Sequence, residues 1–80
     1  MRIACVTGAT AGFGMETARV LAKEGFRVII TGRREDRLKS LANELGGACL
    51  PLCFDVRDEK AVKSAFATLP KAWHAIDLLV

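Results

Sequence analysis

Three glycines fall within the stretch TGATAGFG, residues 7–14, directly after the apolar run at residues 3–6. Glycine accepts a positive φ and lets another molecule approach the backbone closely, so the chain can leave a strand sharply here and begin a helix. The free N–H groups and the positive end of such a helix favour a diphosphate. The stretch therefore predicts a diphosphate-binding turn made of Gly8, Ala9, Thr10, Ala11, Gly12, Phe13 and Gly14. The alternative is a tight turn that needs glycine for packing only.

A second candidate site is the pair Arg33 and Arg34, which follows the β-branched run at residues 27–31. Two guanidinium groups suit a phosphate, because each charge-assisted hydrogen bond to it contributes about 1.5 to 3 kcal/mol. The alternative is a solvated basic helix start, although positive charge near a helix N-terminus opposes the helix dipole. Arg37, about one turn later, has two open interpretations, a phosphate contact or a solvated side chain.

Apolar runs and segments of helical period alternate along the chain. We expect strands at residues 3–6, 27–31, 48–54 and 76–80, and helices at residues 13–23, 35–45 and 58–69. Strands and helices that alternate across short loops favour right-handed βαβ units in a parallel sheet. We therefore predict one α/β domain over residues 1–80, the first half of a doubly wound sheet with strand order 3-2-1-4 that ends within the fourth strand.

This strand order positions the two candidate sites. Ligands of such sheets bind beyond the carboxyl ends of the strands, where the strand order reverses, and the glycine-rich turn falls at that point. Pro51 removes one backbone donor from the third strand, which is tolerable at the sheet edge where the order places that strand.

The motif Thr-Gly-x-x-x-Gly-x-Gly after the first strand resembles that of the short-chain dehydrogenase/reductase family. TGATAGFG followed by TGRR-x-D-R-L resembles its NADP-dependent 3-hydroxy acid (serine-type) dehydrogenase branch, and the pair Asp55-Val56 and the ending at residues 69–80 fit the same branch. The resemblance covers the whole chain. It implies a Rossmann domain in an oxidoreductase that transfers a hydride between NADP and a small hydroxy acid or other alcohol or carbonyl substrate, and a homo-oligomer for the full-length protein.

Within this resemblance, the end of the second strand indicates the cofactor. Domains that prefer NAD usually have an acidic residue there for the ribose 2′-hydroxyl, and that carboxylate repels a 2′-phosphate. Arg33 and Arg34 stand in its place, so we predict NADP(H). The resemblance also implies that Asp55 accepts a hydrogen bond from the adenine amino group, with the Val56 backbone beside the ring. The alternative is that Asp55 caps the third helix, a role for which Asp58 competes.

The resemblance implies carbonyl reduction, or its reverse, by a tyrosine acid/base with a lysine and a serine. The chain contains no tyrosine, and the Asn-Asn-Ala-Gly segment expected after the fourth strand is absent. Ser40 and Ser64 fall on expected helices as surface or packing residues. We assign no catalytic residue and expect the cofactor-binding part of a longer NADP-dependent enzyme, inactive alone. The alternative is a short non-catalytic nucleotide-binding or interaction module.

Composition argues against several other classes of protein. The net charge is +3, but no aromatic platform accompanies the arginines, so we expect no nucleic-acid partner. No apolar run reaches the length of a membrane span or forms a signal peptide, so we expect a cytoplasmic protein without a membrane partner. Cys5, Cys49 and Cys53 fit neither a CxxC motif nor a disulfide framework, which favours buried free thiols over a metal or redox role. We expect no metal site, and His74 at the surface.

Overall fold

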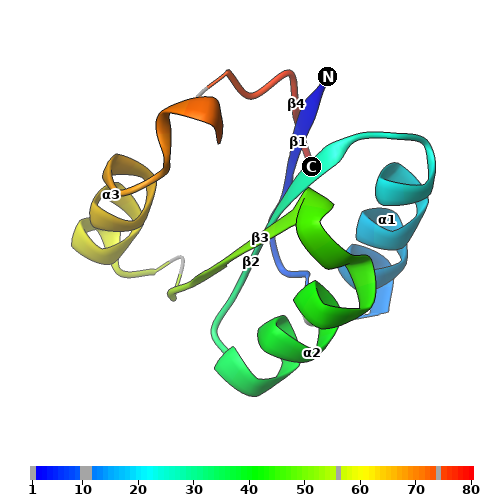
Figure 1. Ribbon diagram of the computed structural model, residues 1–80. Coiled ribbons are helices and arrows are strands. Elements are labelled where there is room, and N and C mark those ends of the chain that lie inside the picture. Colours follow the sequence, from blue (N-terminus) through cyan, green and yellow to red (C-terminus); the bar gives the residue numbers. More distant parts are fainter. Residues whose placement is uncertain (1, 10–11, 56, 74) are drawn as a thin grey trace.

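The computed structural model describes residues 2–9, 12–55, 57–73 and 75–80 (Figure 1). Its strands form one parallel sheet in the order β3-β2-β1-β4. They are β1 (Ile3–Val6), β2 (Arg27–Gly32), β3 (Cys49–Cys53) and β4 (Leu78–Leu79). The helices are α1 (Gly12–Lys23), α2 (Glu35–Leu45) and α3 (Glu59–Ala67), with the short 3-10 turns η1 (Gly46–Ala48) and η2 (Lys71–Trp73). The predicted α/β fold and strand order are confirmed.

Helices cover both faces of the sheet, with α1 and α2 on one face and α3 on the other (Figure 1). Side chains of a strand alternate between the two faces. Val28 and Ile30 of β2 therefore pack with Leu41 of α2, while Ile29 lies in the opposite cluster with Trp73 of η2. Burial on both sides explains why the central strands are nearly continuous apolar runs. Within the described residues, no helix has the length and apolar character needed to cross a membrane.

The third strand and the third helix are shorter than expected. Strand β3 begins at Cys49, because the 3-10 turn η1 occupies the residue before it. Helix α3 begins after Asp58, its N-cap, whose carboxylate accepts a hydrogen bond from the Ala61 backbone N–H at 3.1 Å. It ends at Ala67, where Thr68 is the C-cap. Both strand and helix still stand where the sequence pattern predicts them.

Pro51 lies in the outer strand β3, opposite Ile30 of β2. Just after β3, the Phe54 N–H donates to the Gly32 carbonyl at 2.9 Å. Successive residues of a strand direct their backbone groups to alternate sides, and Phe54 is an odd number of residues from Pro51. The Pro51 nitrogen therefore faces away from β2, and the missing donor removes no hydrogen bond from the ladder. The predicted edge position is confirmed.

The strand at the opposite edge of the sheet is β4, which pairs with β1. The Asp77 N–H donates to the Ile3 carbonyl at 2.8 Å, and the Val80 N–H donates to the Cys5 carbonyl at 2.9 Å. The Asp77 carboxylate also accepts the Ile3 N–H at 2.9 Å. The pairing thus extends beyond Leu78–Leu79 and holds the carboxyl end of β4 beside that of β1, next to the glycine-rich turn.

Candidate functional site

The chain turns sharply at Gly8, directly after β1. Gly8 has a φ of +66°, in the left-handed region that side chains disfavour. Ala9 is fully buried, and its N–H donates to the Thr31 carbonyl at 2.9 Å. This hydrogen bond ties the turn to the end of β2, so the turn and the residues after β2 lie at the same edge of the sheet.

The other two glycines of the stretch have different surroundings. A Cβ on Gly14 would overlap the Gly8 carbonyl oxygen and lie 3.0 Å from the Ala9 Cα, so Gly14 serves the close packing of α1 on the turn. A Cβ on Gly12 would meet no described heavy atom within 4 Å. Gly14 therefore has a packing role, whereas the described residues leave the space beside Gly12 open.

The amino end of α1 is electrostatically suited to an anion. No acidic residue stands in its first turn, whereas α2 begins with Glu35 and Asp36 and α3 with Glu59. The positive end of the α1 dipole is therefore not offset by a carboxylate in its first turn. The Phe13 side chain beside this end is 95% exposed, so it makes little contact with the rest of the described chain.

Arg33 and Arg34 follow β2 and are exposed. Arg34 is the N-cap of α2, with an extended backbone and no side-chain hydrogen bond to the helix. Arginine is not among the favoured N-cap residues, which accept hydrogen bonds from the helix. The acidic first turn of α2 compensates its dipole, so the helix tolerates the basic pair. In the described part of the chain Arg34 has no ion pair, and Arg33 has one long contact, 3.9 Å from its Nη1 to Asp55 Oδ2.

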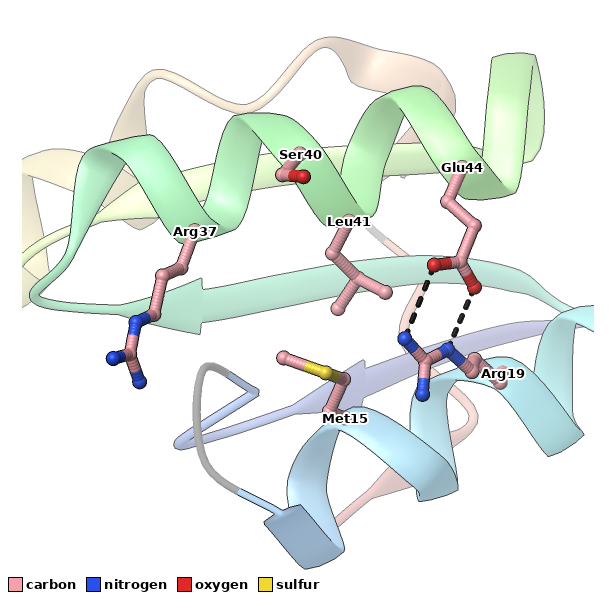
Figure 2. A pocket seen from close by; sticks show the side chains of 6 residues that line it. All are labelled: Met15, Arg19, Arg37, Ser40, Leu41 and Glu44. Atoms are coloured by element: carbon pink, nitrogen blue, oxygen red, sulfur yellow. Dashed lines mark hydrogen bonds and ion pairs between the residues drawn. The ribbon is translucent and has the colours of Figure 1, made fainter.

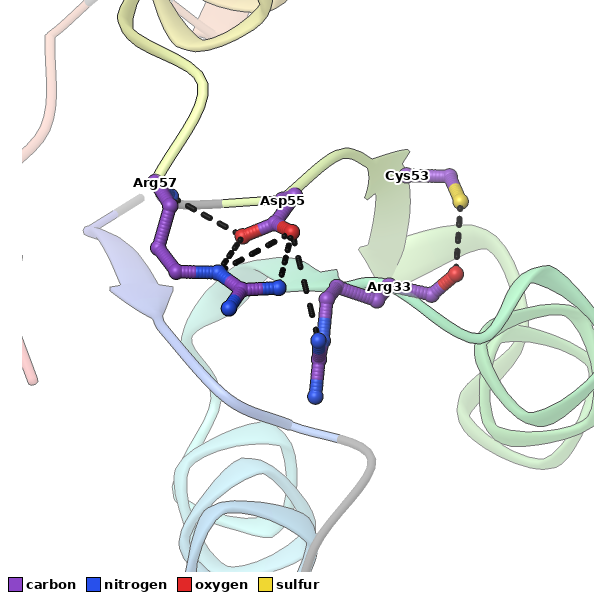
Figure 3. Close-up of polar contacts among 4 residues, drawn as sticks. All are labelled: Arg33, Cys53, Asp55 and Arg57. Atoms are coloured by element: carbon purple, nitrogen blue, oxygen red, sulfur yellow. Dashed lines mark hydrogen bonds and ion pairs between the residues drawn. The ribbon is translucent and has the colours of Figure 1, made fainter.

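Asp55 lies after β3 and binds Arg57 (Figure 3). Its carboxylate accepts hydrogen bonds from the Arg57 backbone N–H at 2.9 Å and from Nη2 at 2.9 Å. The hydrogen bonds from the Arg57 side chain lower the pKa of Asp55 from 3.8 to about 2, and the backbone hydrogen bond is the next largest cause of this shift. The alternative that Asp55 caps α3 is wrong, because Asp58 has that role. Sequence reasoning missed Arg57, for which the only signal was a charge two residues after Asp55.

A cleft of about 260 Å³ lies between α1 and α2 (Figure 2). Arg19 crosses it to Glu44, with 2.6 Å from Nε to Oε2, and also binds Glu16. Arg37 lines the same cleft, and no ion pair to it occurs among the described residues. Figure 2 shows its guanidinium extending away from the Arg19 pair. Both interpretations of Arg37 stay open. Ser40 also lines the cleft, as an exposed side chain of α2.

The three cysteines differ in exposure. Cys5 is buried, and Cys49 is partly buried, with its pKa raised by burial to about 11. The expectation of buried thiols is wrong for Cys53, which is exposed at the end of β3 with its Sγ 3.5 Å from the Arg33 carbonyl. The edge strand ends there, and the described chain does not cover it. All three are free, and no group of potential metal ligands occurs within the described ranges.

The structure thus brings the turn at Gly8, Gly12 and Gly14 together with Arg33 and Asp55 at the carboxyl ends of adjacent strands. Four residues with predicted placements lie outside the described residues, namely Thr10, Ala11, Val56 and His74. The amino end of α1 and the guanidinium groups of Arg33 and Arg34 both suit phosphate oxygens as hydrogen-bond donors.

The chain is similar to known proteins over almost all of its length. Residues 2–80 match the profile of the family described as short chain dehydrogenase. A probable NADP-dependent dehydrogenase of Haemophilus influenzae is 54% identical over 77 residues, which are 96% of this chain and 31% of that protein. Serine 3-dehydrogenase of Agrobacterium fabrum is 53% identical over 75 residues, 94% of this chain and 30% of that protein.

A solved structure extends the similarity to three dimensions. The closed form of serine dehydrogenase complexed with NADP⁺ matches with a TM-score of 0.93 and 45% identity over 96% of this chain and 31% of that one. The chain therefore spans about a third of the length of these relatives.

Proposed function

Because this chain belongs to the short-chain dehydrogenase family, we propose that it binds NADP(H) and forms the cofactor-binding part of an oxidoreductase. The relative from H. influenzae is named NADP-dependent, and the similar serine dehydrogenase was solved with NADP⁺. The observation that favours NADP(H) in this chain is the place of the arginines. Ala9 N–H binds the Thr31 carbonyl, and Arg33 and Arg34 follow within three residues, with no carboxylate between.

Each part of the dinucleotide has a proposed position. Residues 8–14 would hold the diphosphate, since a Cβ on Gly12 would meet no described atom within 4 Å and α1 has no acidic first turn. Arg33 and Arg34, which are exposed and have guanidinium donors, would hold the 2′-phosphate. Asp55 and the Val56 backbone would contact the adenine. These residues would orient the cofactor through its phosphates and adenine, and its nicotinamide would supply or accept the hydride.

The proposed substrate is a small hydroxy acid, or another alcohol with its carbonyl product. The support is similarity to a serine 3-dehydrogenase. The 80 residues contain no tyrosine, so we propose that the acid/base chemistry of the family needs residues other than these and that this segment alone has no activity. The second candidate is a short nucleotide-binding or interaction module without chemistry. It predicts NADPH binding without oxidation of NADPH by any 3-oxo acid.

Calorimetric titration of the full-length protein with NADPH and with NADH tests the cofactor assignment. One or two arginine–phosphate bonds would favour NADPH by about tenfold to ten-thousandfold. In the double variant Arg33→Ala/Arg34→Ala this preference falls towards one, whereas Lys60→Ala, which removes an exposed cation of α3, leaves it unchanged. A preference that survives the double substitution would show the assignment to be wrong.

A further inference from the structure

The Asp55 carboxylate lies between two guanidinium groups and is shared unequally (Figure 3). Arg57 engages both oxygens: its backbone N–H and Nε donate to Oδ1 at 2.9 and 3.2 Å, and its Nη2 donates to Oδ2 at 2.9 Å. Arg33 Nη1 is 3.9 Å from Oδ2, too far for a hydrogen bond. Arg57 therefore binds the carboxylate, whereas the Arg33 guanidinium makes no hydrogen bond to it.

This unequal sharing matters because a carboxylate and a phosphate compete for the same guanidinium. Arginine binds both in the same bidentate geometry. If Arg57 released Asp55, the carboxylate would have only a short distance to move to bind Arg33. Asp55 would remain charged at neutral pH in either arrangement, since even its ordinary pKa is 3.8. A free Asp55 would therefore occupy the donors that a phosphate needs.

We propose that Arg57 is a positioning residue for recognition of the 2′-phosphate, a proposal that rests on the proposed function. Arg57 holds the Asp55 carboxylate so that the Arg33 guanidinium stays available to the phosphate. Arg57 acts through Asp55 and not on the phosphate itself. The side chains of Arg57 and Arg33 are 76% and 65% exposed, so solvent weakens every pair in this cluster. The effect on cofactor preference is therefore moderate.

A double-mutant cycle on the full-length protein tests this proposal, with the ratio of NADH to NADPH dissociation constants as the readout. The ratio cancels any contact with the adenine, which both cofactors share. Arg57→Ala lowers the preference for NADPH roughly three- to tenfold, less than the loss of a whole arginine–phosphate bond. Arg57→Lys, which keeps a cation beside Asp55, retains part of the preference. Lys60→Ala, which removes an exposed cation of α3, has no effect.

The deciding measurement is Arg57→Ala in the background of Asp55→Asn. The neutral amide competes only weakly for Arg33, because it lacks the charge and the second oxygen of a carboxylate, so Arg57→Ala then changes the preference by less than about twofold. A full-sized effect in that background would mean that Arg57 binds the phosphate directly, and it would overturn the proposal. An unchanged preference in the single Arg57→Ala variant would overturn it as well. Wild-type protein without any preference for NADPH would refute the proposed function along with it.

Discussion

Gly14 in the first turn of α1 packs directly on the carbonyl group of Gly8, six residues earlier. A Cβ on Gly14 would overlap the carbonyl oxygen and lie 2.9 Å from the carbonyl carbon. The contact is between backbone segments, so no flexible side chain can yield. Because the same turn is tied to β2 through the Ala9 N–H, this contact sets the position of the α1 amino end relative to the ends of β1 and β2.

Gly14→Ala is therefore expected to destabilise the protein. An added methyl group in a tightly packed place costs about 1 to 3 kcal/mol, because the helix or the turn must shift. Urea unfolding of the full-length protein followed by far-UV circular dichroism measures the loss. The matched control is Gly12→Ala, which meets no described atom within 4 Å and has no positive φ, so its stability stays close to that of the wild type. Equal stability of the two variants would contradict this packing role.

Thiol labelling is expected to separate the cysteines by exposure. Iodoacetamide at pH 8 modifies Cys53 first, because Cys53 is the exposed cysteine of the three. Cys49 and Cys5 react slowly in the folded protein, since burial raises the pKa of Cys49 to about 11 and also raises that of Cys5. Mass spectrometry of peptides gives the order, and urea-unfolded protein, in which the three rates converge, is the control. Equal labelling of Cys5 and Cys53 in the folded state would contradict the described sheet.

The ionisation of Asp55 is expected to depend on Arg57. In the folded protein the hydrogen bonds from Arg57 lower the pKa of Asp55 from 3.8 to about 2. The pair therefore stabilises the folded state above about pH 4 and loses this contribution as the pH falls towards 2. An NMR titration of the Asp55 carboxyl carbon shows a midpoint near 2 in the wild type. The double variant Arg33→Ala/Arg57→Ala, which removes both described ion-pair partners of Asp55, moves the midpoint towards 3.8. A wild-type midpoint at 3.8 would mean that the Asp55–Arg57 contact does not persist in solution.

Sequence reasoning succeeded where local pattern is enough. The alternation of apolar runs with helical periodicity predicted the sheet order, and Pro51 correctly indicated the edge strand. The sequence did not show that Gly12 and Gly14 have different roles. The path of the backbone through the turn decides that Gly14, and not Gly12, packs on the Gly8 carbonyl. The sequence also left Asp55 and Asp58 as competing caps, since both precede the same helix and only the backbone geometry selects Asp58.

By itself, the sequence determined the α/β class, the glycine-rich turn and the basic pair after the second strand, since periodicity and residue type act over a few neighbouring residues. Only the tertiary structure decided that Asp55 lies between Arg33 and Arg57 and that Cys53 is exposed. Arg33 and Asp55 are far apart along the chain and meet because β2 and β3 pair in parallel and end side by side. The residue pattern along one strand does not show which residues of another strand lie beside it. The register between β2 and β3 decides that Arg33 and Asp55 are neighbours.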